Sequence, residues 1–360
     1  MLVPVSRKTF SSKVSRIVLV VSLGLFVVTR DRLTTRELPP RARIDALAYR
    51  VYEGLRSSRQ RRVRLQLPQV AAELSEVLLA PARDLLAGRR LLVVGEGLLH
   101  YVPFAALPFP GAAGEGESLV EQFEVVHLPS AAVMKALEAR EKARPKPPKE
   151  LAVLAAAVYQ GPGQEPGEWS DLPHTAEEAK AILELVPPEK SLAALGFAAK
   201  PELVREGHLA AYRILHFATH GKVDEENPEL SGVALSMWDE EGHPRDGSLR
   251  LHEIYNLDLP ADLVVLSACN TALTPKAQGA GLVGLTHGFF YAGASRLLVS
   301  LWDVDDEATA KLMELFYRGL LVEKLKPAEA LRQAQRELKK NERFGAAYYW
   351  AGFVLEGSWK

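Results

Sequence analysis

The feature that most constrains the fold is a regular alternation of short apolar runs and amphipathic segments in the C-terminal part of the chain. Residues 212–218 (YRILHFA), 262–268 (DLVVLSA) and 296–302 (RLLVSLW) have the length and composition of buried strands. Residues 175–186 and 305–321 have helical spacing instead. This alternation predicts a mainly parallel sheet that is covered by helices on both faces.

A charged stretch with three prolines, residues 140–150, has the composition of a linker. Residues 90–97 (RLLVVGEG), on its N-terminal side, resemble another buried strand. We therefore predict a smaller α/β subdomain over residues 1–139, a linker over 140–150 and a larger α/β subdomain over 151–360.

The N-terminal segment allows two interpretations. Residues 17–28 form an apolar run that follows several basic residues, as in a signal peptide. However, no A-x-A-like cleavage site follows, and twelve residues are too few to span a bilayer as a helix. Because β-branched residues are dense in this run, we favour a buried pair of strands.

Charge and cysteine content limit the functional classes. The 360 residues include 44 basic and 45 acidic side chains, so the formal net charge is −1. No global field then favours nucleic acid or an anionic membrane, and we expect neither as a partner. The single cysteine, Cys269, cannot form an internal disulfide, which fits a reducing cytoplasm best.

Two chemically capable segments follow predicted strands. His220 and Gly221 come just after the strand that ends near Phe217, and Cys269 lies two residues beyond Ser267. Because parallel strands present their carboxyl ends at one edge, neighbouring strands would bring His220 and Cys269 together. An imidazole next to a thiol makes a base and nucleophile pair. The backbone N–H groups of Gly221 and Cys269 would supply an oxyanion hole.

Simpler interpretations stay open. A lone cysteine is often a small buried hydrophobic residue. His216 and His220 are four residues apart, as in a metal-binding helix, but a strand end does not place them on one face and no third ligand is near. We therefore expect no metal site, and without a glycine-rich phosphate loop we expect no cofactor.

Several longer blocks carry a family resemblance. The blocks are His216–Gly221 (HFATHG), Asn227–Leu235, Leu251–Leu273, Gly281–Thr309 and Tyr348–Gly357. They resemble the CHAT domain family, the caspase-like and separase-like domains that are often attached to tetratricopeptide repeats. The resemblance extends from about Leu25 to the C-terminal block. The separation of 49 residues between His220 and Cys269 is also close to that in caspases.

The resemblance implies a caspase-like three-layer α/β/α sandwich with a mainly parallel sheet, preceded by a smaller non-catalytic caspase-like α/β subdomain. It implies a cysteine endopeptidase that cleaves a protein substrate, with Cys269 as nucleophile, His220 as general base and Gly221 as oxyanion donor. Asp303 or Asp306 would supply an acid to the substrate pocket and favour a basic side chain. A tetratricopeptide-repeat or other activating protein could act in trans.

The chain also departs from this family. It has Gly279-Ala280-Gly281 where many relatives carry an acid between the two glycines, and it lacks the repeats usually fused upstream. An alternative is therefore a non-catalytic interaction or scaffold module in a bacterial signalling or defence pathway. A third possibility is a zymogen-like enzyme in which a partner orders residues 274–280.

Overall fold

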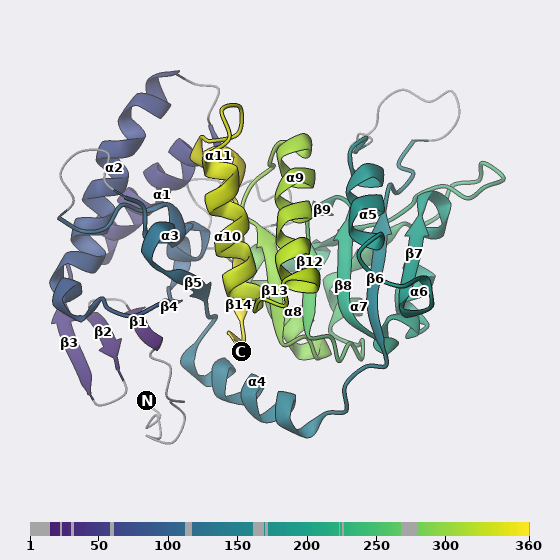
Figure 1. The fold of residues 1–360 in the computed structure, drawn as a ribbon, viewed down its shortest axis with the longest axis horizontal. Helices are drawn as coiled ribbons and strands as arrows, with labels where there is room; N and C mark the ends of the chain where they lie inside the picture. Colours follow the sequence, from purple (N-terminus) through teal and green to yellow (C-terminus); the bar gives the residue numbers. More distant parts are fainter. Residues whose placement is uncertain are drawn as a thin grey trace.

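The structure is a computed structural model that describes residues 15–21, 24–29, 32–57, 61–111, 117–160, 169, 172–222, 224, 227–267 and 280–359. Its centre is an eleven-stranded sheet (Figure 1). The strands of this sheet are β1 (Ser15–Val21), β2 (Gly24–Val28), β3 (Leu33–Glu37), β4 (Arg90–Val94), β5 (Glu124–His127), β6 (Lys149–Ala155), β7 (Ser191–Leu195), β8 (Tyr212–Ala218), β12 (Leu263–Leu266), β13 (Arg296–Ser300) and β14 (Phe353–Gly357).

The order of strands across the sheet is β3-β2-β1-β4-β5-β14-β13-β12-β8-β6-β7. Neighbours pair in parallel except at β3–β2, β2–β1 and β14–β13. The mainly parallel sheet predicted from the sequence is therefore confirmed. A separate three-stranded sheet contains β9 (Gly221–Lys222), β10 (Gly232–Ala234) and β11 (Ser248–Arg250).

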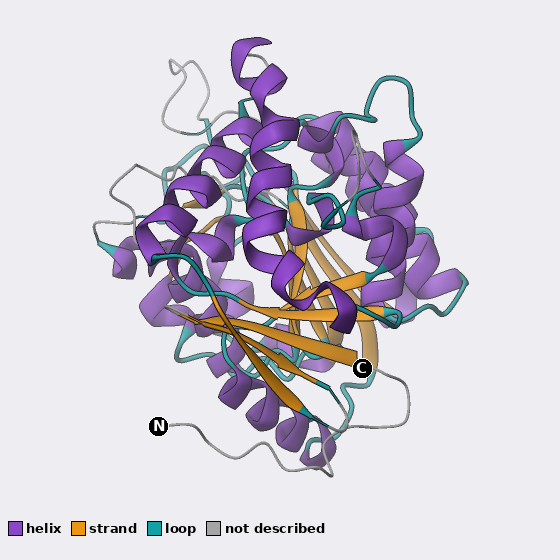
Figure 2. Cartoon of the chain, turned by 90° about the vertical axis from the view of Figure 1, so that its left-hand side faces the viewer, coloured by secondary structure: helices purple, strands orange, loops and turns teal. Residues whose placement is uncertain are grey.

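Helices lie on both sides of the large sheet, as Figure 2 shows. They are α1 (Arg41–Arg56), α2 (Arg61–Leu79), α3 (Leu119–Gln122), α4 (Ala131–Ala143), α5 (Thr175–Leu183), α6 (Pro201–Arg205), α7 (Leu251–Ile254), α8 (Ala280–Ala292), α9 (Asp306–Tyr317), α10 (Pro327–Lys339) and α11 (Ala347–Trp350).

Adjacent residues of β8 demonstrate the two covered faces, because successive side chains of a strand point to opposite sides. The ring of His216 meets Tyr317 of α9 at 5.4 Å between centroids. The ring of Phe217, the next residue, meets Phe289 of α8 at 6.1 Å. All four side chains are buried, which makes β8 a central strand of the core.

The apolar N-terminal run forms the strand pair that its β-branched residues predict. β1 and β2 are antiparallel, with Ile17 opposite Val28. β1 also pairs in parallel with β4, so the hairpin extends the large sheet. Within the described ranges, every helix is too short or too polar to cross a membrane.

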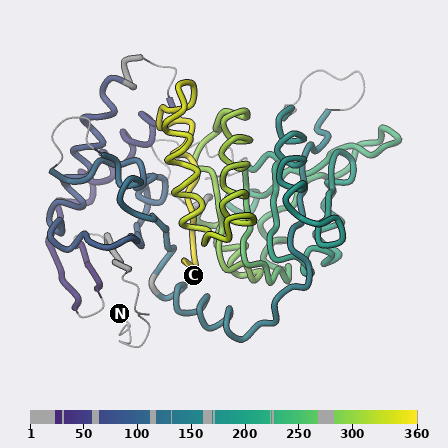
Figure 3. Tube along the Cα trace, viewed as in Figure 1, coloured from purple at the N-terminus to yellow at the C-terminus, as the bar shows by residue number. Residues whose placement is uncertain are grey.

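The predicted linker lies between regular elements. Helix α4 extends to Ala143 and β6 begins at Lys149, and Figure 3 shows this connection running along one edge of the molecule. Arg144 binds back to the C-terminal part through the carbonyl oxygens of Gly293 (2.8 Å) and Ala261 (3.1 Å). The division into subdomains 1–139 and 151–360 stays a prediction, because both parts contribute strands to one sheet.

Candidate active site

The two strands that lead to the proposed dyad are direct neighbours. β8 and β12 pair in parallel with Phe217 opposite Leu266, and the N–H of Ser267 donates to the carbonyl oxygen of Phe217 at 3.0 Å. Both strands therefore end at the same edge of the sheet, as the sequence predicts for adjacent strands. Cys269 lies two residues beyond Ser267, outside the described residues.

His220 is held at this edge by aromatic residues. Its backbone N–H donates to the hydroxyl of Tyr159 at 3.0 Å, and that hydroxyl donates to the carbonyl oxygen of Ala234 at 3.1 Å. The imidazole contacts the ring of Tyr159 at 4.8 Å and that of Trp169 at 5.0 Å between centroids. The half-buried imidazole is therefore oriented by packing on two rings as well as by its backbone.

Sequence reasoning missed Tyr159 and Trp169. Tyr159 follows β6, which pairs with β8, so its position just past a predicted strand was an available signal. Trp169 follows the glycine- and proline-rich residues 161–167 after one intervening residue, Glu168. That composition indicates a loop but not where the loop's aromatic residue will pack.

Gly221 lies in the short strand β9, where the sequence predicts a loop. The N–H of Ala234 donates to the carbonyl oxygen of His220 at 2.8 Å, whereas the N–H of His220 donates to the Tyr159 hydroxyl and not back to Ala234. Gly221, opposite Val233, occupies the next position of this antiparallel ladder and directs its N–H away from β10. Because β9 is an edge strand of the small sheet, this N–H faces outward from that sheet.

The two candidate pocket acids differ in their surroundings. Asp303 follows β13 and is exposed, and its carbonyl oxygen accepts a hydrogen bond from the Tyr348 hydroxyl at 3.0 Å. Asp306 is half-buried at the start of α9, and its carboxylate accepts a hydrogen bond from the backbone N–H of His174 at 3.0 Å. Burial raises the pKa of Asp306, and the nearby carboxylates of Glu178 and Asp305 add to this effect.

A buried polar network lies beneath this edge of the sheet. The imidazole of His216 contacts the Glu178 carboxylate at 2.9 Å through Nε2 and the Tyr317 hydroxyl at 3.0 Å through Nδ1. All three side chains are almost completely buried. Burial, with a contribution from Glu178, raises the pKa of Tyr317 well above its ordinary value, so this phenol stays protonated.

His216 and His220 thus have different environments, in keeping with their positions on and after a strand. His216 points to the α5 and α9 side of the sheet, whereas His220 lies past its carboxyl edge. In the part of the chain that the structure describes, no group of three or more His, Cys, Asp or Glu side chains could hold a metal ion.

The fold and this edge together define a class of protein. A mainly parallel sheet between two helical layers, with a histidine past the carboxyl end of a central strand, is the caspase-like α/β/α arrangement. A family model described as the CHAT domain matches residues 68–358, and the chain belongs to the CHAT domain family.

The comparisons with individual proteins agree with this assignment. Tetratricopeptide repeat protein 28 of Homo sapiens is 29% identical over 305 residues, and its Mus musculus counterpart is 28% identical over 307 residues. Each match covers 75% of this chain but only 12% of the relative. The structure of the Saccharomyces cerevisiae separase–securin complex matches with a TM-score of 0.58 at 11% identity, over 95% of this chain and 30% of that chain. This last likeness is one of fold.

Proposed function

We propose that the protein is a cysteine endopeptidase that cleaves a protein substrate with Cys269 as nucleophile and His220 as general base. The observation that carries the proposal is the parallel pairing of β8 with β12, because the carboxyl ends of both strands then lie at one edge of the sheet. The Cys269 thiolate would attack the peptide carbonyl, and the protonated His220 would give its proton to the departing amine. Water would then hydrolyse the thioester and restore the free thiol.

The orientation of Gly221 supports an oxyanion hole in this mechanism. Its N–H points away from β10, and the residue has no side chain to keep a substrate carbonyl at a distance. Together with the N–H of Cys269, it would donate to the oxyanion that forms during attack. Loss of one such donor typically lowers kcat by about 10²–10³-fold.

The surroundings of Asp306 support specificity for a basic side chain next to the cleaved bond. Its carboxylate is half-buried and already oriented by the N–H of His174. A carboxylate in such a position binds an arginine or lysine more strongly than an exposed one, because less solvent screens the charge. Asp303, which is exposed, is the second candidate for this role.

A thiol-directed acyloxymethyl ketone with an arginine beside the ketone tests the proposal directly. We expect covalent labelling of the wild type, no labelling of Cys269→Ala and labelling at least about 100-fold slower in His220→Ala. The same reagent with glutamate in place of arginine should react more slowly, and Asp306→Asn should reduce this preference. Mass spectrometry of the labelled protein measures each rate.

The labelling is repeated with tetratricopeptide-repeat proteins added, because the curated relatives carry such repeats in their names. Equal labelling of wild type and Cys269→Ala under all these conditions would contradict an enzymatic role.

A reducing compartment such as the cytoplasm would keep Cys269 as a thiol, and we propose that location.

A non-catalytic interaction module is the second candidate function, favoured by Ala280 in place of the acid that many relatives carry. In that case a cell that expresses Cys269→Ala would behave as the wild type, whereas deletion of residues 68–358 would abolish the function. Loss of function on the single substitution would contradict this alternative.

A further inference from the structure

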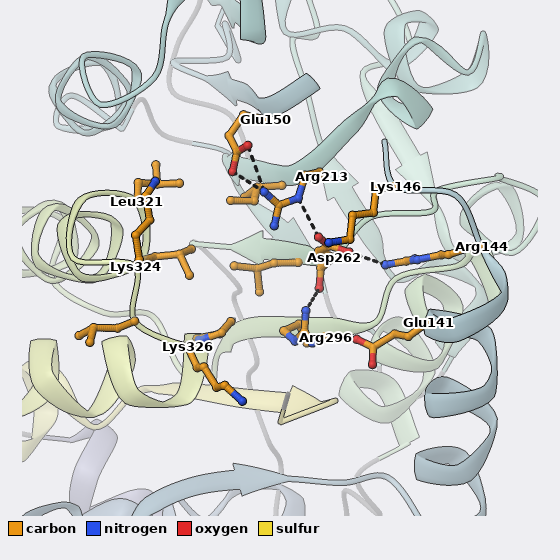
Figure 4. A pocket seen from close by; sticks show the side chains of 15 residues that line it. Glu141, Arg144, Lys146, Glu150, Arg213, Asp262, Arg296, Leu321, Lys324 and Lys326 are labelled. Atoms are coloured by element: carbon orange, nitrogen blue, oxygen red, sulfur yellow. Dashed lines mark hydrogen bonds and ion pairs between the residues drawn. The ribbon is translucent and has the colours of Figure 1, made fainter. Parts of the chain in front are cut away.

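A second candidate site lies at the opposite edge of the sheet, where the central parallel strands begin. A cavity of about 450 Å³ opens there between the starts of β6, β8, β12 and β13 and the start of α10 (Figure 4). Its charged lining residues are Glu141, Arg144, Lys146, Glu150, Arg213, Asp262, Arg296, Lys324 and Lys326. Six of these side chains are basic and three are acidic, so the lining carries an excess of three positive charges.

The three arginines of the lining are paired with its three carboxylates. Arg213 contacts Glu150 at 2.9 Å and Asp262 at 2.9 Å. Arg144 contacts the other oxygen of Asp262 at 2.8 Å. Figure 4 shows Arg213 and Arg144 directed toward Asp262, with Glu150 next to Arg213.

Arg296 is the third arginine of these ion pairs. It is almost completely buried and contacts Glu141 at 2.7 Å, and it also donates to the carbonyl oxygens of Asp262 (2.9 Å) and Ser358 (3.0 Å). Each acidic charge of the lining is therefore neutralised inside the protein by a guanidinium group.

The three lysines therefore carry the excess positive charge of the lining. Lys146, Lys324 and Lys326 are all exposed, and none of their ammonium groups forms an ion pair or a hydrogen bond with a described residue. Lys146 comes from the segment before β6, and the other two come from the segment before α10. Two separate parts of the chain thus bring unpaired cations to one cavity.

Arg213 adds a further donor to this group. Its Nε and Nη1 atoms make all of its ion pairs, and Nη2 has no hydrogen-bond partner among the described residues. Figure 4 shows the Arg213 guanidinium at the cavity between Glu150 and Asp262. An anion in the cavity could therefore accept a hydrogen bond from a guanidinium that is already held in place.

The backbone before α10 has two unusual features that shape the mouth of the cavity. Residues Arg318–Val322 form a π-helical turn, a conformation that is frequent at functional sites. Lys324 then adopts a left-handed conformation with φ of +58°, which is rare for a residue with a side chain. After it, Lys326 occupies the N-cap position of the 13-residue helix α10 without a side-chain capping bond, and the positive dipole end of this helix lies at Pro327 in the lining.

We propose that this cavity binds a small polyanion that carries two or more phosphate groups. Its volume is in the range of small-molecule sites, and its concave shape excludes the broad contact that a nucleic acid would make. Three cations together with a helix N-terminus match several phosphate charges better than one. The apolar side chains of Leu320, Leu321 and Leu325 also line the cavity and would contact an organic part of the ligand.

Isothermal titration of the whole chain with inorganic tripolyphosphate, at fixed ionic strength, tests the proposal. We expect a saturable site with a stoichiometry of one, and at least about 10-fold weaker binding by the double variant Lys324→Gln/Lys326→Gln. The matched control is Lys190→Gln/Lys200→Gln, which removes the same charge from exposed lysines outside the cavity. Far-UV circular dichroism and thermal unfolding verify that both variants fold.

Adenosine triphosphate without a metal ion is the second probe. Binding tighter than that of tripolyphosphate would show that the leucines contact an organic group, and equal binding would show recognition of the phosphates alone; both results support the site. Absence of saturable binding, or equal weakening in the control variant, would overturn it. Because binding is measured without any reaction of Cys269, this result is independent of the proposed peptidase activity.

Discussion

His216 and His220 show how four residues of sequence separate a structural histidine from a candidate catalytic one. His216 is still inside β8, so its ring points into the layer of α5 and α9 and pairs with Glu178 and Tyr317. His220 is past the end of the strand, where its ring packs on Tyr159 and Trp169. The end of the strand therefore decides which imidazole lies within the helical layer and which lies past the carboxyl edge of the sheet.

Glu178→Ala should destabilise the fold substantially, because it removes the buried carboxylate that contacts His216. We expect the free energy of unfolding to fall by about 3 kcal/mol, since the buried imidazole of His216 loses its carboxylate partner. Glu177→Ala, at an exposed neighbouring position, should change it by less than about 0.5 kcal/mol. Urea denaturation measures both, and equal effects would show that the network does not contribute to stability.

That His220 follows the end of β8 was predictable from local sequence, but the partners of His220 were not, and Cys269 lies outside the described residues. Glu178 lies 38 residues before His216 in a helix, and no spacing rule links them. Nothing in the local pattern shows that Asp306 binds the N–H of His174. Such contacts depend on how helices pack against each other, which periodicity does not specify.

Long apolar elements were easier to predict than short ones. The predicted strand 212–218 is β8 residue for residue, and the predicted helix 175–186 begins at the same residue as α5 and extends three residues beyond its end. The strands β9, β10 and β11 have only two or three residues each, too few for a period-2 pattern. This small sheet is nevertheless the element that orients Gly221.

Gly232→Ala should disrupt the small sheet. A Cβ at Gly232 would lie too close to the carbonyl oxygen of Leu249 and 3.0 Å from the Cα of Arg250, and both of these atoms belong to the backbone of β11. We expect a loss of about 2 kcal/mol in the free energy of unfolding and faster amide exchange in β9 and β10. Hydrogen–deuterium exchange measures the second effect.

Gly284→Ala is the matched control for this substitution. Gly284 lies inside α8 with only an ordinary contact to Leu251, at 3.5 Å, and alanine favours a helix. We expect this variant to be as stable as the wild type or more stable. Unchanged exchange of β9 in Gly232→Ala would mean that the strands can move apart without cost.

The N-terminal and C-terminal parts of the molecule join where β5 pairs with β14, and ionisable groups are buried at this junction. His127 of β5 lies opposite Glu356 of β14. Burial lowers the pKa of His127 to about 3 and that of His100 to about 4, and in each case a neighbouring histidine adds to the effect. Burial raises the pKa of Glu356 to about 7.

Acidification should therefore destabilise the fold. His100 and His127 bind protons more weakly in the folded than in the unfolded chain, so their contribution is complete above about pH 6.5 and is lost as pH falls towards 4 and then 3. We expect each histidine to lower the free energy of unfolding by on the order of 1 kcal/mol for each pH unit of acidification in this range. Urea denaturation between pH 7 and pH 4.5 measures the slope.

Glu356 changes the stability with pH in the opposite direction to the two histidines. Its raised pKa contributes stability that is present below about pH 4.5 and is lost as pH rises through 7. Glu356→Gln should therefore remove this opposing contribution and make the acid destabilisation steeper. A stability that does not change between pH 7 and pH 4.5 in this variant would contradict the assignment of neutral, buried His100 and His127.

The position of β14 in the sheet has a consequence for the order in which the fold forms during translation. β14 lies between β5 and β13, and every other strand of the sheet precedes it in the chain. While the chain is being synthesised, the strands before residue 128 and those after residue 148 are complete but have no strand to connect them. The continuous sheet can therefore form only after residues 353–357 have left the ribosome, and until then the edges of β5 and β13 are open to other chains.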